Sequence, residues 1–193
     1  MTKPREILVV SGANGTGKTT VALVYARQLG LPYIGADEIA ATLAPDDPAS
    51  QRIAASRQFI SDVAAAIEGR ESVVIESTLS GRTFIRTIQE ARDAGFTISL
   101  VHLFLDLADT CVARVAERVQ KGGHDVPEAD IRRRFTRSAA NFWHLYRPLS
   151  DRWVLMYNST SDAQCVAEGD AETHTVQDSE LFDSFMQNVQ AND

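Results

Sequence analysis

The most restrictive feature of the sequence is an eight-residue stretch near its start, where residues 12–19 read GANGTGKT. This stretch fits the phosphate-binding pattern G-x-x-x-x-G-K-[ST] at every fixed position. It follows the aliphatic run at residues 7–10, typical of a buried strand, and precedes a run of helix formers that stops at Gly30. A glycine-rich turn between a strand and a helix points backbone N–H groups into one concavity at the positive end of the helix. The sequence therefore predicts a nucleoside triphosphate site.

The motif also assigns roles to single residues. Lys18 would reach the β- and γ-phosphates, and the hydroxyl of Thr19 would ligate Mg²⁺. The residues expected to bind the triphosphate are Gly12, Ala13, Asn14, Gly15, Thr16, Gly17, Lys18, Thr19 and Thr20. The alternative is a glycine-rich turn that matches the pattern by accident. The predicted strand before the loop and the predicted helix after it argue against this alternative.

Segments typical of strands and helices alternate along the rest of the chain, which favours an α/β fold with a mainly parallel sheet. We predict a P-loop sandwich of three layers, α/β/α, around five strands. The further strands are expected at residues 31–34, 72–76, 96–105 and 153–157. Helices are expected at residues 19–29, 38–43, 47–68, 84–94, 109–121, 127–146 and 179–189. We expect residues 1–193 to form one domain, with an acidic and loop-rich tail at about 159–193.

The charge distribution limits the classes of ligand. The net charge of −7 argues against a nucleic-acid protein held by a general positive field. Residues 112–137 nevertheless carry seven Lys and Arg against four Asp and Glu, which suggests a small anionic ligand. No apolar run approaches the roughly 18 residues of a membrane span, and the start of the chain lacks a signal-peptide pattern. We therefore expect a cytoplasmic protein with neither nucleic acid nor membrane as its partner.

Two carboxylates fall where parallel strands should end, which is where open α/β sheets bind ligands. Asp37 follows the strand after the first helix, and it could accept the proton of an attacking hydroxyl or hold a water bound to Mg²⁺. The alternative for Asp37 is a helix N-cap. Glu76 ends the third strand and could sense Mg²⁺ or bind substrate, the alternative being a solvated strand end.

Arginines on both sides of Gly122 and Gly123 resemble a lid over about residues 109–137. A mobile arginine that arrives on closure would stabilise the charge that phosphoryl transfer spreads over the γ-phosphate oxygens. Charged helices that simply face water are the alternative. We interpret His124, beside the two glycines, as a loop residue rather than a catalyst.

Several stretches together resemble the zeta toxin-like family of P-loop kinases, in particular its short members labelled as predicted ATPases. They are residues 12–19, Ala36–Glu38, the loop ESTLSGR at residues 76–82, and residues 114–141 with GGHDVP at 122–127. The resemblance covers roughly residues 5–158. The P-loop is common to many families, whereas its combination with the other stretches is far more specific.

This resemblance implies a nucleoside-monophosphate-kinase-like core that transfers the γ-phosphate of ATP or GTP to a sugar hydroxyl. Zeta toxins act on the 3′-hydroxyl of UDP-N-acetylglucosamine, which is therefore the expected acceptor, and the family also implies an antitoxin as partner. Asp37 matches the family's base, and Arg118 matches one lid arginine that contacts phosphate. Arg134, or Arg133, would replace the second lid arginine. The acceptor-binding residues would be Asp37, Glu76, Thr78 and Arg82.

Two other interpretations remain open from the sequence. Asp37 also stands where shikimate- and gluconate-type kinases place an acid that binds the acceptor, so another small hydroxyl compound would fit. A nucleotide-dependent switch or binding module with slow hydrolysis is the alternative from a different class. A measurement of ADP release would distinguish a kinase from a switch, because a substrate stimulates this release in a kinase but not in a switch.

Overall fold

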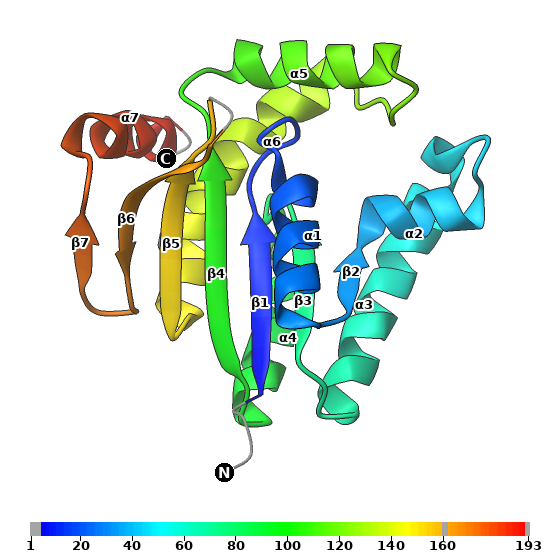
Figure 1. Cartoon of the computed structure of the whole chain (residues 1–193), viewed down its shortest axis with the longest axis horizontal. Coiled ribbons are helices and arrows are strands. Elements are labelled where there is room, and N and C mark those ends of the chain that lie inside the picture. Colours follow the sequence, from blue (N-terminus) through cyan, green and yellow to red (C-terminus); the bar gives the residue numbers. More distant parts are fainter. Residues whose placement is uncertain (1–4, 160–161, 192–193) are drawn as a thin grey trace.

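The computed structural model describes residues 5–159 and 162–191. They form a sheet of seven strands in the order β2-β3-β1-β4-β5-β6-β7 (Figure 1). The strands are β1 (Glu6–Ser11), β2 (Tyr33–Gly35), β3 (Val73–Ser77), β4 (Thr97–Phe104), β5 (Arg152–Tyr157), β6 (Gln164–Gly169) and β7 (His174–Val176). The first five pair in parallel, whereas β6 and β7 are antiparallel additions at one edge. The predicted α/β class and mainly parallel sheet are confirmed.

Alternate residues of β1 pack against helices on opposite faces of the sheet, as expected for a strand buried on both sides. Leu8 and Val10 pack with Ala22 and Ala26 of α1 (Lys18–Leu29). Ile7 and Val9 belong to a larger core on the other face. The helices that pack there are α3 (Arg52–Glu68), α4 (Phe84–Asp93), α6 (Glu128–Asn141) and α7 (Ser179–Gln190). The parallel strands therefore all end at one edge between two helical layers, which is where the loops gather (Figure 1).

The prediction of five strands is wrong, because the tail expected to be loop-rich contributes β6 and β7 before the predicted helix α7. β6 has only three apolar residues, Cys165 to Ala167, among polar neighbours, and β7 has three residues in all. Polar neighbours in β6 and the shortness of β7 leave almost no periodic signal in either strand. They form because β5 offers an edge with which β6 can pair, and β6 in turn pairs with β7.

The spacing of Ile53, Ile60, Ala64 and Ile67 predicts that they form the buried stripe of the helix at 47–68, and the structure confirms this only in part, since Ile67 packs against the core. Ala55, Phe59 and Val63 face the core, whereas Ile53 and Ile60 of the predicted apolar stripe are 71% and 49% exposed. The helix α2 (Ala36–Leu43) and the short 3-10 turn η1 (Pro48–Gln51) lie next to α3. As a result, the sequence did not indicate that α3 presents polar and apolar residues to a cleft.

The two arms of the expected lid are α5 (Ala108–Gln120) and α6, joined by residues 121–127. The sequence predicts Asp109 as the N-cap of α5, but the N-cap is Leu107. Asp109 lies in the first turn of the helix and pairs with Arg132 at 2.7 Å. A π-helical turn, η2 (Phe142–Tyr146), and a 3-10 turn, η3 (Arg147–Leu149), continue α6 toward β5. None of the helices in the described ranges is long and apolar enough to cross a membrane.

Candidate active site

The P-loop runs from the end of β1 to the start of α1, as predicted. Its three glycines, Gly12, Gly15 and Gly17, have positive φ angles. Two features of Gly12 exclude a residue with a side chain. Its φ angle is +140°, and an added Cβ atom would collide with the carbonyl oxygen of Leu103. Asn158, which follows β5, donates a 2.7 Å hydrogen bond to the carbonyl of Thr16. Backbone shape and a contact from a neighbouring strand end thus both fix the loop.

Lys18 is buried and lies between a carbonyl and a carboxylate. Its Nζ donates to the carbonyl of Ala13 at 3.0 Å and lies 3.8 Å from Oε1 of Glu76. The hydroxyl of Tyr33 donates to the other oxygen of Glu76 at 2.5 Å. Burial, followed by the charge of Glu76 and this hydrogen bond, raises the pKa of Tyr33 well above its usual range, so the phenol stays protonated as the donor. The floor of the site is therefore a cation and a carboxylate, both held in place.

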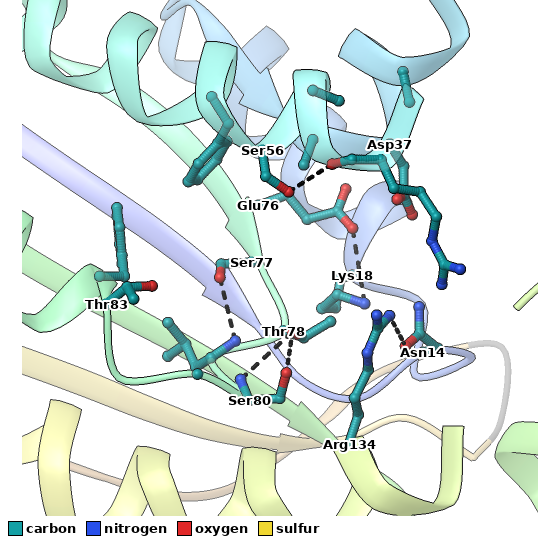
Figure 2. Close-up of a pocket in the computed structure, with 18 of the residues that line it drawn as sticks. Asn14, Lys18, Asp37, Ser56, Glu76, Ser77, Thr78, Ser80, Thr83 and Arg134 are labelled. Carbon is teal, nitrogen blue, oxygen red and sulfur yellow. Dashed lines mark hydrogen bonds and ion pairs between the residues drawn. The ribbon is translucent and has the colours of Figure 1, made fainter. Parts of the chain in front are cut away.

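A cleft of about 340 Å³ opens from the P-loop (Figure 2). This volume is within the range of small-molecule sites. Its lining comes from the P-loop, α2, α3, the loop after β3, the α5–α6 connection and α6. The residues on this lining that bear charges or rings are Lys18, Asp37, Arg52, Phe59, Glu76, Phe84, His124, Arg134 and Tyr146. The predicted residues Asn14, Lys18, Asp37, Glu76, Thr78 and Arg134 therefore share one cavity.

One wall of this cleft consists of α2 and α3. Asp37 is exposed and lies in the first turn of α2, whose N-cap is Gly35, so the alternative role of Asp37 as the N-cap is wrong. From α3 come Ser56, Phe59 and Ile60, which the sequence analysis did not predict. This wall combines a carboxylate and a hydroxyl with apolar area, the mixture that suits an organic acceptor with polar groups.

The opposite wall is the loop at residues 77–83, which α6 and its π-helical turn hold by side chains. Ser138 donates to the carbonyl of Thr78 at 2.5 Å, and Asn141 donates to that of Leu79 at 2.8 Å. Tyr146 donates to the carbonyl of Gly81 at 2.7 Å. Leu79 is buried and has φ of +50°, a costly conformation for a residue other than glycine. These three donors keep the loop in its unusual shape.

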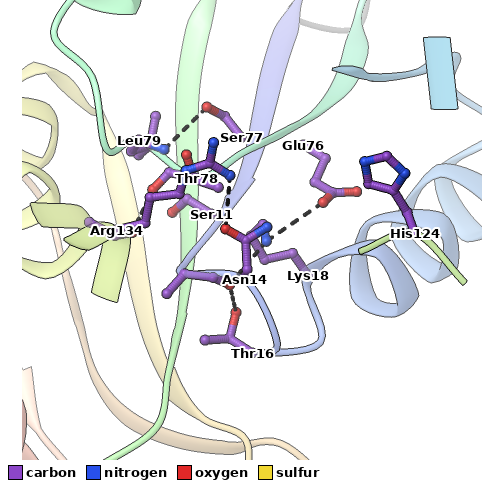
Figure 3. Close-up of polar contacts among 12 residues, drawn as sticks. Ser11, Asn14, Thr16, Lys18, Glu76, Ser77, Thr78, Leu79, His124 and Arg134 are labelled. Carbon is purple, nitrogen blue, oxygen red and sulfur yellow. Dashed lines mark hydrogen bonds and ion pairs between the residues drawn. The ribbon is translucent and has the colours of Figure 1, made fainter. Parts of the chain in front are cut away.

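Arg134 reaches the P-loop from α6 and donates to Oδ1 of Asn14 at 3.0 Å (Figure 3). Burial lowers the pKa of Arg134 from its usual value, and Asp130 and Asp37 act in the opposite sense by favouring the charged form. An arginine remains protonated despite such a shift. A fixed positive charge therefore stands beside the phosphate loop in the described conformation.

Other predicted residues lie outside the lining of the cleft. The side chains of Thr19 and Thr20 are exposed on the first turn of α1, and Arg82 is exposed beside the 77–83 loop. Arg118 donates to the carbonyl of His124 at 2.6 Å, so its guanidinium group contacts the backbone of the α5–α6 connection. His124, interpreted from the sequence as a loop residue, lines the cleft. A catalytic role for Arg118 and an acceptor-binding role for Arg82 stay predictions.

The donor types around the P-loop fit a magnesium ion. Mg²⁺ prefers oxygen ligands and commonly takes most of them from water and substrate phosphates. The hydroxyl of Thr19 follows directly on Lys18, and the carboxylate of Glu76 lies on the floor of the same site. Within the described ranges, no group of three His, Cys, Asp or Glu side chains is arranged to hold a metal ion.

Solved structures with the same fold include nucleotide-binding and kinase proteins. The complex AvrRxo1-ORF1:-ORF2 with ATP is similar with a TM-score of 0.73 and 17% identity over 94% of this chain. This chain spans 63% of that longer chain. The PezAT toxin-antitoxin system of Streptococcus pneumoniae gives a TM-score of 0.63 and 14% identity over 99% of this chain and 88% of that chain. A gluconokinase from Sinorhizobium meliloti gives 0.53 and 14% identity over 97% and 93% of the two chains.

Sequence comparison adds a relative and a family. A Haemophilus influenzae protein described as uncharacterized is 31% identical over 124 residues, which are 64% of this chain and 88% of the relative. The family model described as "AAA domain" matches residues 7–140, from β1 to the end of α6. That span contains the P-loop, Asp37, Glu76, the 77–83 loop and Arg134, and the fold around it is P-loop kinase-like. The chain belongs to this AAA domain family.

Proposed function

We propose that the protein is a phosphotransferase that moves the γ-phosphate of ATP or GTP to a hydroxyl group of a small molecule. The observation that carries this proposal is the shared cleft, in which the P-loop lysine and two carboxylates face the same space as an organic-acceptor wall. A protein that only binds or hydrolyses a nucleotide does not need the α2–α3 wall for an organic acceptor. Because the ATP complex and the gluconokinase have the same fold, they support both the donor and the reaction type.

In this proposal each residue has one role in the transfer. Lys18 and Arg134 bind the transferring phosphate and stabilise the charge on its oxygens, while the P-loop backbone holds the rest of the triphosphate. The hydroxyl oxygen of the acceptor forms a bond to the γ-phosphorus, and Asp37 accepts the proton of that hydroxyl. The bond between the γ-phosphorus and the β-phosphate oxygen breaks at the same time, and the nucleoside diphosphate leaves. Thr19 would ligate Mg²⁺, which supplies further positive charge at the phosphates when bound. Glu76 and Thr78 contact the acceptor, with Arg82 at the edge of that region.

UDP-N-acetylglucosamine is the acceptor that we propose to test first. The family resemblance of the ESTLSGR loop and of the GGHDVP segment points to it, and the fold of a toxin-antitoxin protein supports the same direction. Hydroxyl groups and aromatic rings on the cleft walls are suited to a sugar nucleotide. A protein antitoxin as partner and a cytoplasmic location belong to this same proposal.

A sugar acid or related metabolite is the second candidate, because the gluconokinase shares the fold over 97% of this chain. The two candidates are distinguished by one screen, in which purified protein, ATP or GTP and Mg²⁺ are incubated with a panel of hydroxyl metabolites. Phosphorylated product is detected by mass spectrometry. Product from UDP-N-acetylglucosamine alone supports the first candidate, and product from a sugar acid supports the second.

The variant Asp37→Asn tests the reaction type itself. Asparagine keeps the shape of the side chain but loses its basicity, so we expect kcat to fall by roughly 10²–10⁴ with nucleotide affinity unchanged within about a few-fold. Glu38→Gln is the matched control, since Glu38 is the exposed neighbouring acid and does not line the cleft. Wild-type turnover in Asp37→Asn would exclude Asp37 as the base and move that role to Glu76.

A further inference from the structure

The connection between α5 and α6 is built so that one side chain, His124, enters the cleft. His124 lines the same cavity as Lys18 and Glu76, although it comes from a different part of the chain. Figure 3 shows its imidazole ring on the side of Lys18 on which Glu76 lies. Neither the motif nor the proposed mechanism gives His124 a role, although its ring lies on the lining of the cleft.

The residues before His124 fix the path of the backbone. α5 ends as the N–H of Gly122 bonds to the carbonyl of Val119 and that of Gly123 bonds to the carbonyl of Arg118, with φ of +84° at Gly122. At Gly123 an added Cβ would lie 2.9 Å from the carbonyl oxygen of Arg118, so a larger residue would push the turn away. The two glycines therefore let the chain fold back tightly under the end of α5.

Arg118 then holds the next residue. Its guanidinium donates to the carbonyl of His124 at 2.6 Å, and its aliphatic stem packs where a side chain on Gly123 would be. The Nε of Arg118 is buried and has no hydrogen-bond partner within the described residues, so the carbonyl of His124 is the polar contact that anchors this side chain. A charged donor on a backbone carbonyl is a strong hydrogen bond.

The residues after His124 close the arrangement. Val126 is 5% exposed and packs in the small core under α5 and α6. Pro127 is the N-cap of α6, whose first turn begins directly after it. The backbone on both sides of His124 is therefore held, and its side chain lines the cleft.

We propose that His124 contacts the acceptor in the cleft and that Arg118 acts through it, as a positioning residue rather than a contact of the transferring phosphate. This inference rests on the proposed phosphotransferase function and adds to it a residue of the acceptor site. A neutral imidazole offers one hydrogen-bond donor and one acceptor, which suits the hydroxyl or amide groups of a polar metabolite. In this proposal, the segment GGHDVP at residues 122–127 serves to place the imidazole ring of His124 in the cleft.

A double-mutant cycle separates the two roles of Arg118. His124→Ala should reduce kcat/KM for the acceptor by about 10- to 100-fold, with the affinity for ATP unchanged within about two-fold. Arg118→Met keeps the packed stem, loses the guanidinium, and should give a similar defect. The double variant should be no worse than His124→Ala, because both changes remove the same contact. Losses that multiply would show Arg118 acting independently on phosphate and would overturn the inference. Asp125→Asn, an exposed neighbour outside the cleft, is the control.

A second readout needs no turnover. The chain has four histidines, and the imidazole proton resonance of His124 is assigned as the one missing in His124→Ala. Adding UDP-N-acetylglucosamine with Mg²⁺ and ATP should shift this resonance in the wild type and much less in Arg118→Met. A resonance that stays unchanged while phosphate is transferred refutes the role of His124. A shift without any phosphorylated product supports His124 as a ligand contact and counts against the proposed reaction instead.

Discussion

The two walls of the cleft are held in very different ways. The wall formed by the P-loop and the 77–83 loop is fixed by side-chain hydrogen bonds, from Arg134 to Asn14 and from three donors of α6 and η2 to the carbonyls of Thr78, Leu79 and Gly81. On the α2–α3 wall Asp37 and Ser56 are exposed, and the hydroxyl of Ser56 bonds within its own helix, to the carbonyl of Arg52. One ion pair, between Arg52 and Asp130 at 3.5 Å, links this wall to α6.

This difference shows which half of the site is held in place by the protein itself. Donors that are already fixed stabilise developing charge without reorganisation, which suits the phosphate side. The exposed wall carries side chains whose positions a bound acceptor can still set, which suits closure around a substrate. We therefore expect changes to the donors of the fixed wall to affect both the fold and the chemistry, and changes to the exposed residues Asp37 and Ser56 to affect the chemistry alone.

The largest expected effect is that of Lys18→Ala. Its charge lies at the point where the fixed wall meets the phosphates, so transfer should fall by more than about 10³-fold and triphosphate binding should weaken. Turnover and nucleotide titration measure the two effects, and circular dichroism checks that the fold persists. Turnover like that of the wild type would remove the basis for a kinase.

The next comparison sets Asn141→Ala against Ser56→Ala. Asn141 is 8% exposed, and its loss leaves the buried carbonyl of Leu79 without a donor, so unfolding free energy should fall by about 1–3 kcal/mol. Ser56→Ala removes an exposed hydroxyl and should change it by less than about 0.5 kcal/mol. Urea denaturation measures both. Equal losses would show that the two walls do not differ in the way described.

A pH-dependent effect is expected from the support behind the fixed wall. His102 of β4 is 1% exposed, hydrogen-bonded to Ser11 at 2.9 Å and stacked on Phe142. Burial, followed by the charge of Lys18, lowers the pKa of His102 to about 3 from 6.5. The unfolded chain then binds the extra proton between those values, so stability is complete above pH 6.5 and falls as the pH drops toward 3.

Between pH 7 and pH 5 this histidine should reduce the free energy of unfolding by about 2 kcal/mol. Urea denaturation of the wild type and of His102→Gln at both values measures it, because the variant lacks the titrating group and keeps a polar side chain of similar length. The wild type should lose about 2 kcal/mol more than His102→Gln over this interval. Parallel losses would mean that the imidazole is protonated in the folded protein.

The sequence predicted what local chemistry dictates. The P-loop needs glycines and a lysine at fixed spacing, and most of the five parallel strands are largely apolar runs, so both are recognisable without tertiary information. Asp37 and Glu76 were predicted to share a site because parallel strands end at the same edge of a sheet, and they do share it.

Features set by long-range contacts could not be predicted in this way. Ser138, Asn141 and Tyr146 hold a loop about 60 residues earlier, and nothing in their own spacing identifies that partner. Two isoleucines of α3 have the spacing of core residues, yet Ile60 lines the cleft and Ile53 is exposed, so the prediction is wrong for these two. His124 enters the cleft through backbone geometry that depends on Arg118 and on two glycines together.

The contacts of Lys18 have a consequence for how nucleotide binding would change the site. The ammonium group of Lys18 contacts two oxygens, the carbonyl of Ala13 and a carboxylate oxygen of Glu76. If Lys18 binds the β- and γ-phosphates as proposed, the phosphate oxygens compete with these two for the same ammonium group. Glu76 also accepts a hydrogen bond from Tyr33, and this second contact would hold its carboxylate on the floor of the cleft when Lys18 turns to the phosphates.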